Sequence, residues 1–277
     1  GAKFEIGHVS LKFFNKLNLQ SVYAGDLTNK KIASIDNIEA KINLLSLLKG
    51  DIHIDNITAN NLDANLYTDS IGVLNIQFLI DALTPKEKQQ TPDLIFPIIT
   101  LNNASFKYTN YSIPTQNLKE WQFNVNDIAV DSLFTQIQFS LTNQSNLDAN
   151  INYLNFKEKS GFRLSHLSTC VKLTDSSFVS PFANIKLPNT HLITDSIAIL
   201  LTRNNENRVD WAKTKFKFNI LKADLQLSDL KHFVPEFEHL KKHASASAKI
   251  NGTLDNLKAT NLRAKYGKTL SIKANIE

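Results

Sequence analysis

The eight residues IHIDNITA, positions 52–59, pose the question on which the fold depends. Two isoleucines first alternate with a polar residue, as expected for a β-strand, in which successive side chains point to opposite faces. Asp55 and Asn56 then stand side by side, so a regular strand would place Ile57 and Ala59 on the wrong face. A β-bulge resolves this conflict, because its extra residue restores the alternation and returns both apolar pairs to one face.

The same frame recurs along the chain, with apolar residues at the first, third, sixth and eighth positions of an octad and with Ala and Thr accepted there. We identify eight such octads, where random sequence of this composition would yield about one or two. The other seven are FEIGHVSL (4–11), LNLQSVYA (17–24), ITLNNASF (99–106), FNVNDIAV (123–130), FRLSHLST (162–169), FNILKADL (218–225) and LKATNLRA (257–264). The middle pair could instead form a two-residue hairpin turn, but pairs such as Gly-His, Gln-Ser and Thr-Asn are poor type I′ formers. We therefore favour the bulge, and bulges at a similar height in many strands predict a curved sheet.

Helices are expected to be few. NIQFLIDAL (75–83) predicts one short helix, and LSDLKHFVPEFEHLKKH (227–243) predicts a second, with Ser228 as its N-cap and an apolar stripe along one side. LLSLLKG (44–50) predicts a helical turn. We therefore predict a mainly β fold: a long, curved antiparallel meander that forms an open groove, or β-taco, with one or two short helices.

The expected meander divides into three segments. Residues 1–83 form an amino-terminal groove segment that ends in the short helix, residues 94–225 form a central groove segment, and residues 226–277 form a helix followed by the carboxy-terminal strands of a truncated repeat. The predicted helices contain too few residues to cover the apolar side of such a sheet. That side therefore needs an occupant or must be closed by further sheet, because an exposed apolar surface of this size marks a binding site.

The composition narrows the classes of partner. The formal charge of +5 arises from 31 basic and 26 acidic side chains spread along the whole length. Because no basic block is interleaved with aromatic residues, nucleic acid is not an expected partner, and the excess is a weak argument for an anionic membrane.

The single cysteine, Cys170, excludes an internal disulfide and is expected to be a small buried hydrophobic residue. Trp121 and Trp211 are expected to be packing residues. No apolar run reaches the length of about 18 residues that a membrane helix needs, and because the chain begins with Gly-Ala we expect a fragment of a longer protein.

Catalytic chemistry is not expected. The sequence contains no nucleotide-binding, serine-hydrolase or zinc-protease motif. The best constellation is His232, Glu236, His239 and His243, which would share one face of the predicted second helix at a spacing usable for a metal ion. Lysines flank that face and Pro235 interrupts it, so we expect it to be a solvated polar face. The expectation is a non-enzymatic protein with no catalytic residues, no metal and no cofactor.

Two parts of the chain resemble AsmA/TamB-like envelope proteins, most closely those of Bacteroidetes-type bacteria. In residues 1–83 a strand ending in Phe13 and Phe14 leads to LNLQSVYAGD, to IASIDNIEAKINLLSLLKG, to the bulged strand, to a strand with Tyr67 and to NIQFLIDAL. The later stretch LSDLKHFVPEFEHLKKHASASAKINGTLDNLKATNLRAKYG contains a helix followed by the turn GTLDNL. These parts cover just under half of the chain, and the likeness lies in the order of the elements.

The resemblance implies a long periplasmic protein that is anchored to the inner membrane through an amino-terminal helix missing from this sequence. Such proteins form an extended β-groove with an apolar interior. They are implicated in moving phospholipid toward the outer membrane or in outer-membrane protein assembly, with a BamA/TamA-type protein as a candidate partner. The expected function is therefore to hold or conduct phospholipid acyl chains in the groove. The expected lining residues are Leu17, Leu19, Ile52, Ile54, Ile57, Leu62, Phe106, Phe123, Val125 and Ile128. The alternative is a β-rich structural or interaction scaffold, adhesin-like or an outer-membrane assembly factor, with a sealed core and no lipid.

Overall fold

The computed structural model describes residues 2–13, 15–43, 53–83, 94–114, 117–142, 146–204, 206, 208–240, 242–267 and 270–276. In these residues the chain is mainly β, with strands that follow one another as a meander and with very little helix, so the predicted fold class is confirmed. The strands are β1 (Phe4–Lys12), β2 (Lys16–Gly25), β3 (Lys31–Ile42), β4 (Ile54–Thr68), β5 (Leu94–Ile95), β6 (Ile98–Asn110), β7 (Asp127–Thr142), β8 (Asn146–Glu158), β9 (Arg163–Leu173), β10 (Ser177–Ser180), β11 (Ala183–Lys186), β12 (His191–Leu200), β13 (Lys215–Gln226), β14 (His243–Thr253), β15 (Asn256–Tyr266) and β16 (Leu270–Ile276).

The helical predictions meet different outcomes. The short helix after β4 is confirmed as α2 (Gln77–Leu83). The single helix predicted over 227–243 is wrong, because two 3₁₀ turns, η1 (Leu227–Leu230) and η2 (Pro235–His239), take its place. Pro235 has no N–H to continue a helix. The predicted N-cap is also wrong, since η1 is entered from Gln226 without a side-chain cap. The helical turn predicted at 44–50 lies outside the described residues.

The chain divides into two compact units. Unit 1 consists of Gly1–Thr91, Phe96–Gln138 and Asn155–Phe162, and unit 2 consists of Pro92–Ile95, Phe139–Leu154 and Arg163–Glu277. The strands β7 and β8 contribute residues to both units.

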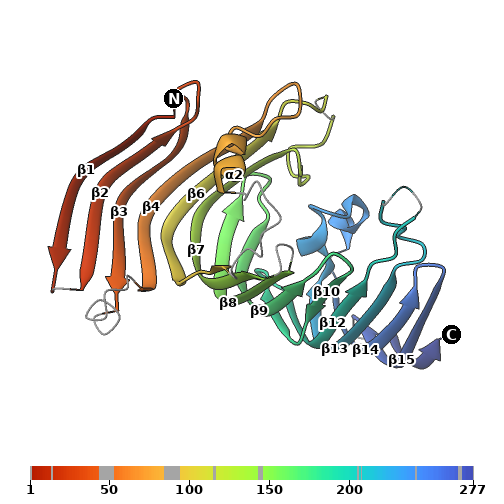
Figure 1. The fold of residues 1–277 in the computed structure, drawn as a ribbon. Helices are drawn as coiled ribbons and strands as arrows, with labels where there is room; N and C mark the ends of the chain where they lie inside the picture. Colours follow the sequence, from red (N-terminus) through yellow and green to blue (C-terminus); the bar gives the residue numbers. More distant parts are fainter. Residues whose placement is uncertain are drawn as a thin grey trace. The chain divides into compact units, whose positions relative to one another are not determined.

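In unit 1 the strands lie in the order β1-β2-β3-β4-β6-β7 (Figure 1). Neighbours are antiparallel with one exception, since β4 and β6 run parallel, from Asn56 beside Ile98 to Thr68 beside Asn110. A parallel pair needs a long connection, and here the connection contains α2 and β5. The predicted meander is therefore interrupted once within the described part of unit 1.

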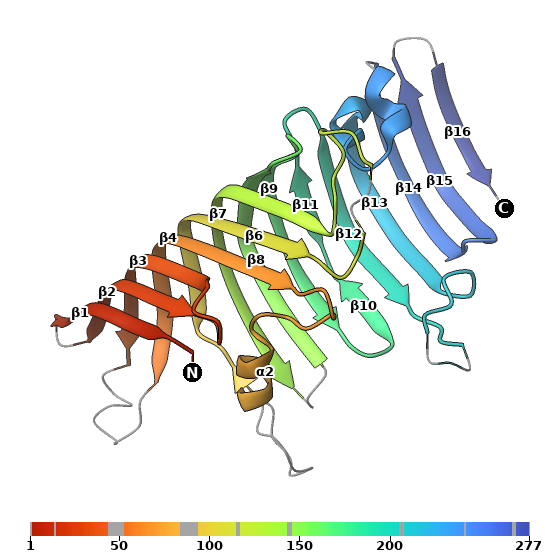
Figure 2. The ribbon, with the colours of Figure 1, turned by 90° about the horizontal axis from the view of Figure 1, so that it is seen from above.

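In unit 2 the strands β12 to β16 lie side by side and antiparallel (Figure 2). On the other side of β12, the short strands β10 and β11 share one place, and both also pair with β9. Pro181 separates these two strands because proline cannot donate to a β-ladder. The buried hydroxyls of Thr169 and Ser180 lie within hydrogen-bond distance of the Phe182 carbonyl oxygen, at 2.8 and 2.6 Å. Cys170 in β9 is half-buried, not fully buried as predicted.

The strands β1, β2, β3, β4 and β6 break their alternation at the same height, and β7 breaks its alternation nearby, across two register shifts in its ladder with β6. The ladder between β1 and β2 pairs Ile6 with Val22 and His8 with Gln20, and thus passes over Gly7 and Ser21. The same break recurs in the next strands, and we name its members the bend row: Gly7, Ser21, Asp36, Asn61, Asn103 and Ser132. Four of them have left-handed backbone, with φ of 54°, 54°, 56° and 51° at Ser21, Asn61, Asn103 and Ser132. The strands of unit 1 bend part-way along their length (Figure 1).

The predicted bulges are found in several octads, and the breaks have two different geometries. In β1, β2 and β6 the break lies at the predicted middle pair. In β1 and β2 it differs from a bulge, because the paired strands each pass over one residue at the same position and the register is kept. One-residue register shifts, which are the predicted bulges, occur beside Asp55 in β4, at 102–103 in β6 opposite β7, at 221–222 in β13 and at 260–261 in β15. In FRLSHLST the ladder with β11 covers only His166 to Thr169, and these residues pair without a shift.

Candidate functional site

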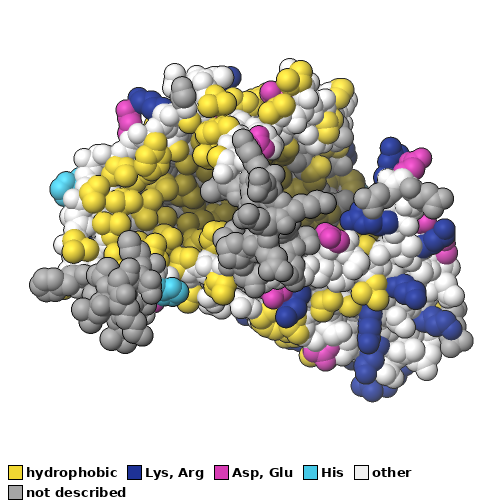
Figure 3. Space-filling view, in the orientation of Figure 1, with side chains coloured by type: hydrophobic (Ala, Val, Ile, Leu, Met, Phe, Trp, Pro, Cys, Tyr) yellow, Lys and Arg dark blue, Asp and Glu magenta, His cyan; other side chains and the backbone are white. Residues whose placement is uncertain are grey.

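Apolar residues lie opposite one another from strand to strand in unit 1. On one side of the bend row the register defines two such rows: Leu11–Leu17–Ala40–Ile57–Ile99–Ile137 and Val9–Leu19–Ile38–Ala59–Leu101–Thr135. On the other side it defines three more: Ile6–Val22–Ile35–Leu62, Phe4–Ala24–Ala33–Ala64–Phe106–Val130 and Leu66–Tyr108–Ile128. We call these five rows the apolar face. Figure 3 shows hydrophobic side chains gathered on one hollowed surface over these strands.

Polar rows separate the apolar ones, as the two-residue period of a strand requires. One of them is Ser10–Asn18–Glu39–Thr58–Thr100–Gln136. At each bend the two polar residues in the middle of the octad both point away from the apolar face. The apolar pairs before and after the bend therefore lie on the same face. The residue types suit this task, since Asn, Ser and Gly accept left-handed backbone or small-radius bends more readily than branched residues.

The apolar face is only partly covered by the residues that the structure describes. On the edge strand β1, Phe4, Val9 and Leu11 are 66%, 54% and 60% exposed. In the inner strands the buried apolar members of the rows are small, namely Val22, Ala40 and Ala59. The larger Leu, Ile and Phe side chains of the same rows remain half-buried. In a sealed core these larger residues would be the most deeply buried ones.

Side chains of the bend row form hydrogen bonds from strand to strand on the polar side of the sheet. Asn61 donates to Asp36 Oδ2 at 2.9 Å, and Asn103 donates to Asn61 Oδ1 at 2.8 Å. Lys31 donates to Asp63, which lowers the pKa of that carboxyl below its usual value. A polar pocket of about 340 Å³ lies beside these residues, and its lining is Asn61, Leu62, Asp63, Asn103, Ala104, Ser105, Asp131 and Ser132.

A buried carboxylate fastens the turn between β2 and β3 to β4. Asp26 is 2% exposed and accepts hydrogen bonds from Thr28 N at 2.8 Å, from Lys30 N at 2.9 Å and from Tyr67 Oη at 2.6 Å. Burial raises the pKa of Asp26, but these hydrogen bonds outweigh it and the pKa lies below its usual value. The hydrogen bond to Asp26 raises the pKa of Tyr67. A carboxylate with so many donors is a poor general base, so this contact is structural.

The structure brings six of the ten predicted lining residues together in the apolar rows: Leu17, Leu19, Ile57, Leu62, Phe106 and Ile128. Ile54 pairs with Ile42 at the end of β3, beyond the register shift at Asp55. Ile52 lies outside the described residues.

The strand predicted at FNVNDIAV is wrong in its first half. Phe123 and Val125 lie before β7, which begins at Asp127, and Val125 is 63% exposed. The reason is local, since Asn124 Oδ1 accepts a hydrogen bond from Asn126 N at 3.0 Å and its carbonyl accepts one from Asp127 N. An asparagine that binds its own backbone in this way forms a turn.

Three further octads of the same template belong to the apolar face and were missed: ASIDNIEA (33–40), ITANNLDA (57–64) and IAVDSLFT (128–135). In β4 the frame ITANNLDA overlaps the frame IHIDNITA. The signal that would have found them is the bend residue itself, since each contains Asp, Asn or Ser at its fifth or fourth position.

The described residues hold no group of three or more His, Cys, Asp or Glu side chains placed to bind a metal ion. His232, Glu236 and His239 lie in and beside the two 3₁₀ turns, whereas His243 begins β14. Within the same residues, no helix has the length and apolar content needed to cross a membrane. A comparison with models of known protein families finds no match for this chain, and a comparison with curated proteins finds none either.

Proposed function

We propose that the apolar face of unit 1 holds the acyl chains of phospholipid, in a periplasmic protein of the AsmA/TamB type that serves outer-membrane biogenesis. The observation that carries the proposal is the set of five apolar rows, which cross the strands while their large side chains keep solvent-accessible surface. The sequence resemblance supplies the compartment, the inner-membrane anchor and the BamA/TamA-type partner that belong to the proposal.

The geometry of the rows suits an extended hydrocarbon chain. Strands are spaced by about 4.8 Å, so six neighbouring strands give rows of roughly 25 Å. A chain that lies along a row would meet apolar side chains at every strand. Its transfer from water would stabilise it by about 0.8 kcal/mol per CH₂ group, or roughly 10 kcal/mol for one acyl chain. Because successive positions along a row are similarly apolar, the chain can move along it with little change in free energy.

The test measures lipid bound to the purified protein. The full chain is isolated from cells, extracted with organic solvent and analysed by mass spectrometry, with phosphorus assayed against protein. The proposal expects phospholipid near or above one molecule per chain. A protein free of lipid would instead favour the scaffold with a sealed interior.

A matched pair of variants locates the lipid. Ala64→Trp places a large side chain within the fourth apolar row, opposite Ala33 and Phe106. Lys107→Trp places the same side chain on the neighbouring, exposed position of β6, outside the apolar rows. We expect the first variant to lose at least half of the bound lipid and the second to keep it. Equal lipid content in both variants would contradict the assignment to this face.

A further inference from the structure

The excess of positive charge belongs to unit 2. Unit 1 contains 13 Lys and Arg against 14 Asp and Glu, a net charge of −1, whereas unit 2 contains 18 against 12, a net charge of +6. This asymmetry is not visible as a basic block in the sequence, because the lysines of unit 2 alternate with apolar residues. An asymmetry of charge between two parts of a chain indicates an interaction with an anionic partner.

Most of this charge lies in the four neighbouring strands β13 to β16. The strands β12 to β16 carry eight Lys and Arg but only two carboxylates, Asp195 and Asp224. All eight cations are exposed: Lys215, Lys217, Lys222, Lys249, Lys258, Arg263, Lys265 and Lys273. Asp224 is paired with Lys222 at 2.8 Å, and this contact lowers the pKa of Asp224.

The register places these cations on the polar face of the strands. It aligns Lys217–Asn251–Lys258, Asn219–Lys249–Thr260, Ser247–Arg263–Lys273 and Asp224–Ser245–Lys265–Ser271. The apolar residues occupy the rows between them, for example Phe218–Ile250–Ala259 and Ala223–Ala246–Ala264–Ile272. Lys and Arg side chains are seen over this part of unit 2 in Figure 3. We call the eight cations the basic face.

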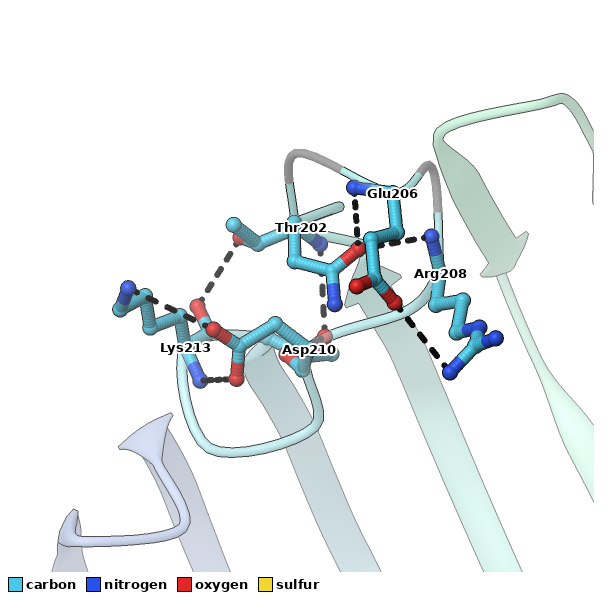
Figure 4. Close-up of polar contacts among 7 residues, drawn as sticks. Thr202, Glu206, Arg208, Asp210 and Lys213 are labelled. Carbon is cyan, nitrogen blue, oxygen red and sulfur yellow. Dashed lines mark hydrogen bonds and ion pairs between the residues drawn. The ribbon is translucent and has the colours of Figure 1, made fainter.

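An exposed tryptophan lies at one end of the same strands. The loop between β12 and β13 holds Trp211, which is 57% exposed, so the prediction that it is a packing residue is wrong. Hydrogen bonds shape this loop: Asn204 Oδ1 accepts from the N–H groups of Glu206 and Arg208, and Asp210 accepts from Lys213 N (Figure 4). Thr214 Oγ1 donates to the Asp210 carbonyl oxygen at 2.9 Å. The loop therefore holds Trp211 in an ordered turn between Arg208 and Lys213, which form ion pairs with Glu206 at 3.2 Å and with Asp210 at 3.4 Å.

We propose that the basic face and Trp211 dock unit 2 on the surface of an anionic lipid bilayer. The cations are spread over the four strands β13 to β16, and all but one are lysines, which act as point charges toward a diffuse anionic surface and not as bidentate ligands of single groups. Tryptophan is the side chain that most favours the interface between headgroups and acyl chains. This inference stands apart from the proposed function, since it concerns other residues in the other unit.

Single-stranded nucleic acid fits these residues less well. It needs aromatic side chains among the cations for base stacking. The aromatic residues of these strands, Phe216, Phe218 and Tyr266, lie in the apolar rows and not on the basic face.

The test measures binding of the full chain to vesicles by co-sedimentation. Vesicles of phosphatidylglycerol mixed with phosphatidylcholine are compared with vesicles of phosphatidylcholine alone. We expect binding to the first only, and its loss when salt is raised from about 0.1 M to about 1 M, which shortens the Debye length from about 10 Å to about 3 Å. In a Trp121→Phe variant, the fluorescence of Trp211 should shift to shorter wavelength on binding.

A pair of variants with the same change in net charge identifies the face. Lys217→Glu combined with Lys258→Glu alters the basic face, whereas Lys12→Glu combined with Lys107→Glu alters exposed lysines of unit 1. We expect the first pair to lower vesicle affinity at least about tenfold and the second to change it little. Equal losses in both pairs, no binding to anionic vesicles, or tighter binding to duplex DNA at equal phosphate with no shift of Trp211 would each overturn the proposal. Vesicle binding and the content of bound lipid are measured separately, so failure of this proposal can be distinguished from failure of the proposed function.

Discussion

The side-chain amide of Asn103 donates a hydrogen bond to Oδ1 of Asn61, 2.8 Å away, and both residues have left-handed backbone. They lie at the bends of the parallel neighbours β4 and β6, in the same register. Asn61 continues the chain of hydrogen bonds to Asp36. One residue type thus performs two tasks, since asparagine accepts the positive φ of the bend and bonds to the bend of the next strand.

The first prediction concerns the backbone at this bend. Asn103→Val should destabilise the protein by about 2 kcal/mol, because a β-branched residue is strained at φ of 56° and cannot replace the hydrogen bond. Asn103→Gly should cost less than about 1 kcal/mol, since glycine accepts this backbone freely. The measurement is unfolding by urea. Asn251→Val, at an exposed position in β14 without positive φ, is the control and should change stability by no more than about 0.5 kcal/mol.

The second prediction concerns the contact of Tyr67 with the buried Asp26. Tyr67→Phe should cost about 1.5–3 kcal/mol at neutral pH, as expected for loss of a hydrogen bond to a charged group. Because the pKa of Asp26 is lowered in the folded state, its stabilisation is present above the unfolded-state pKa of about 3.9 and is lost as the pH falls through the folded-state value. The difference between the two proteins should therefore shrink at acid pH.

This second prediction is checked by urea unfolding at neutral and at acid pH. Tyr23→Phe is the matched control, because it removes a tyrosine hydroxyl from β2 and leaves the hydrogen bond between Tyr67 and Asp26 in place. This change should have little effect on stability at either pH. A stability difference between Tyr67→Phe and the parent protein that does not depend on pH would refute the assigned cause.

The third prediction concerns Glu158, which is 1% exposed at the end of β8. Its carboxylate accepts hydrogen bonds from Ser160 N at 2.7 Å and from Ala129 N at 3.3 Å. Glu158→Ala should destabilise the protein by about 3 kcal/mol because it leaves both amides without their acceptor, whereas Glu158→Gln keeps one acceptor oxygen and should cost about 1 kcal/mol. Thermal and urea unfolding give the two values, and equal costs would contradict this account.

The fourth prediction distinguishes an open apolar face from a sealed core. Leu101 is half-buried in the second apolar row, so Leu101→Ala should cost only about 1 kcal/mol in lipid-free protein. Leu164 is 7% exposed in unit 2, and Leu164→Ala should cost about 2–5 kcal/mol, as for a fully buried leucine. If Leu101→Ala proved as costly as Leu164→Ala, the apolar face would be covered in solution.

Local patterns predicted the elements that depend on neighbouring residues. The octads FEIGHVSL, LNLQSVYA and ITLNNASF place the breaks of β1, β2 and β6 at the right pairs, because the break needs small or amide side chains between two apolar pairs. The short helix α2 was also predicted from the residues of its own segment, NIQFLIDAL. FNVNDIAV fits the same template, but its first half forms a turn. The reason is that the side chain of Asn124 accepts a hydrogen bond from the backbone N–H of Asn126.

The sequence by itself determined that this protein is a mainly β meander with bent, half-apolar strands, since a two-residue period and its interruption are written within each strand. The tertiary structure decided that the bends of β1, β2, β3, β4 and β6 share one register, that β4 and β6 run parallel, and that eight scattered cations of unit 2 share one face. These features depend on which strands become neighbours and on how they are aligned. That choice is made by contacts between residues far apart in the chain, which no local pattern records.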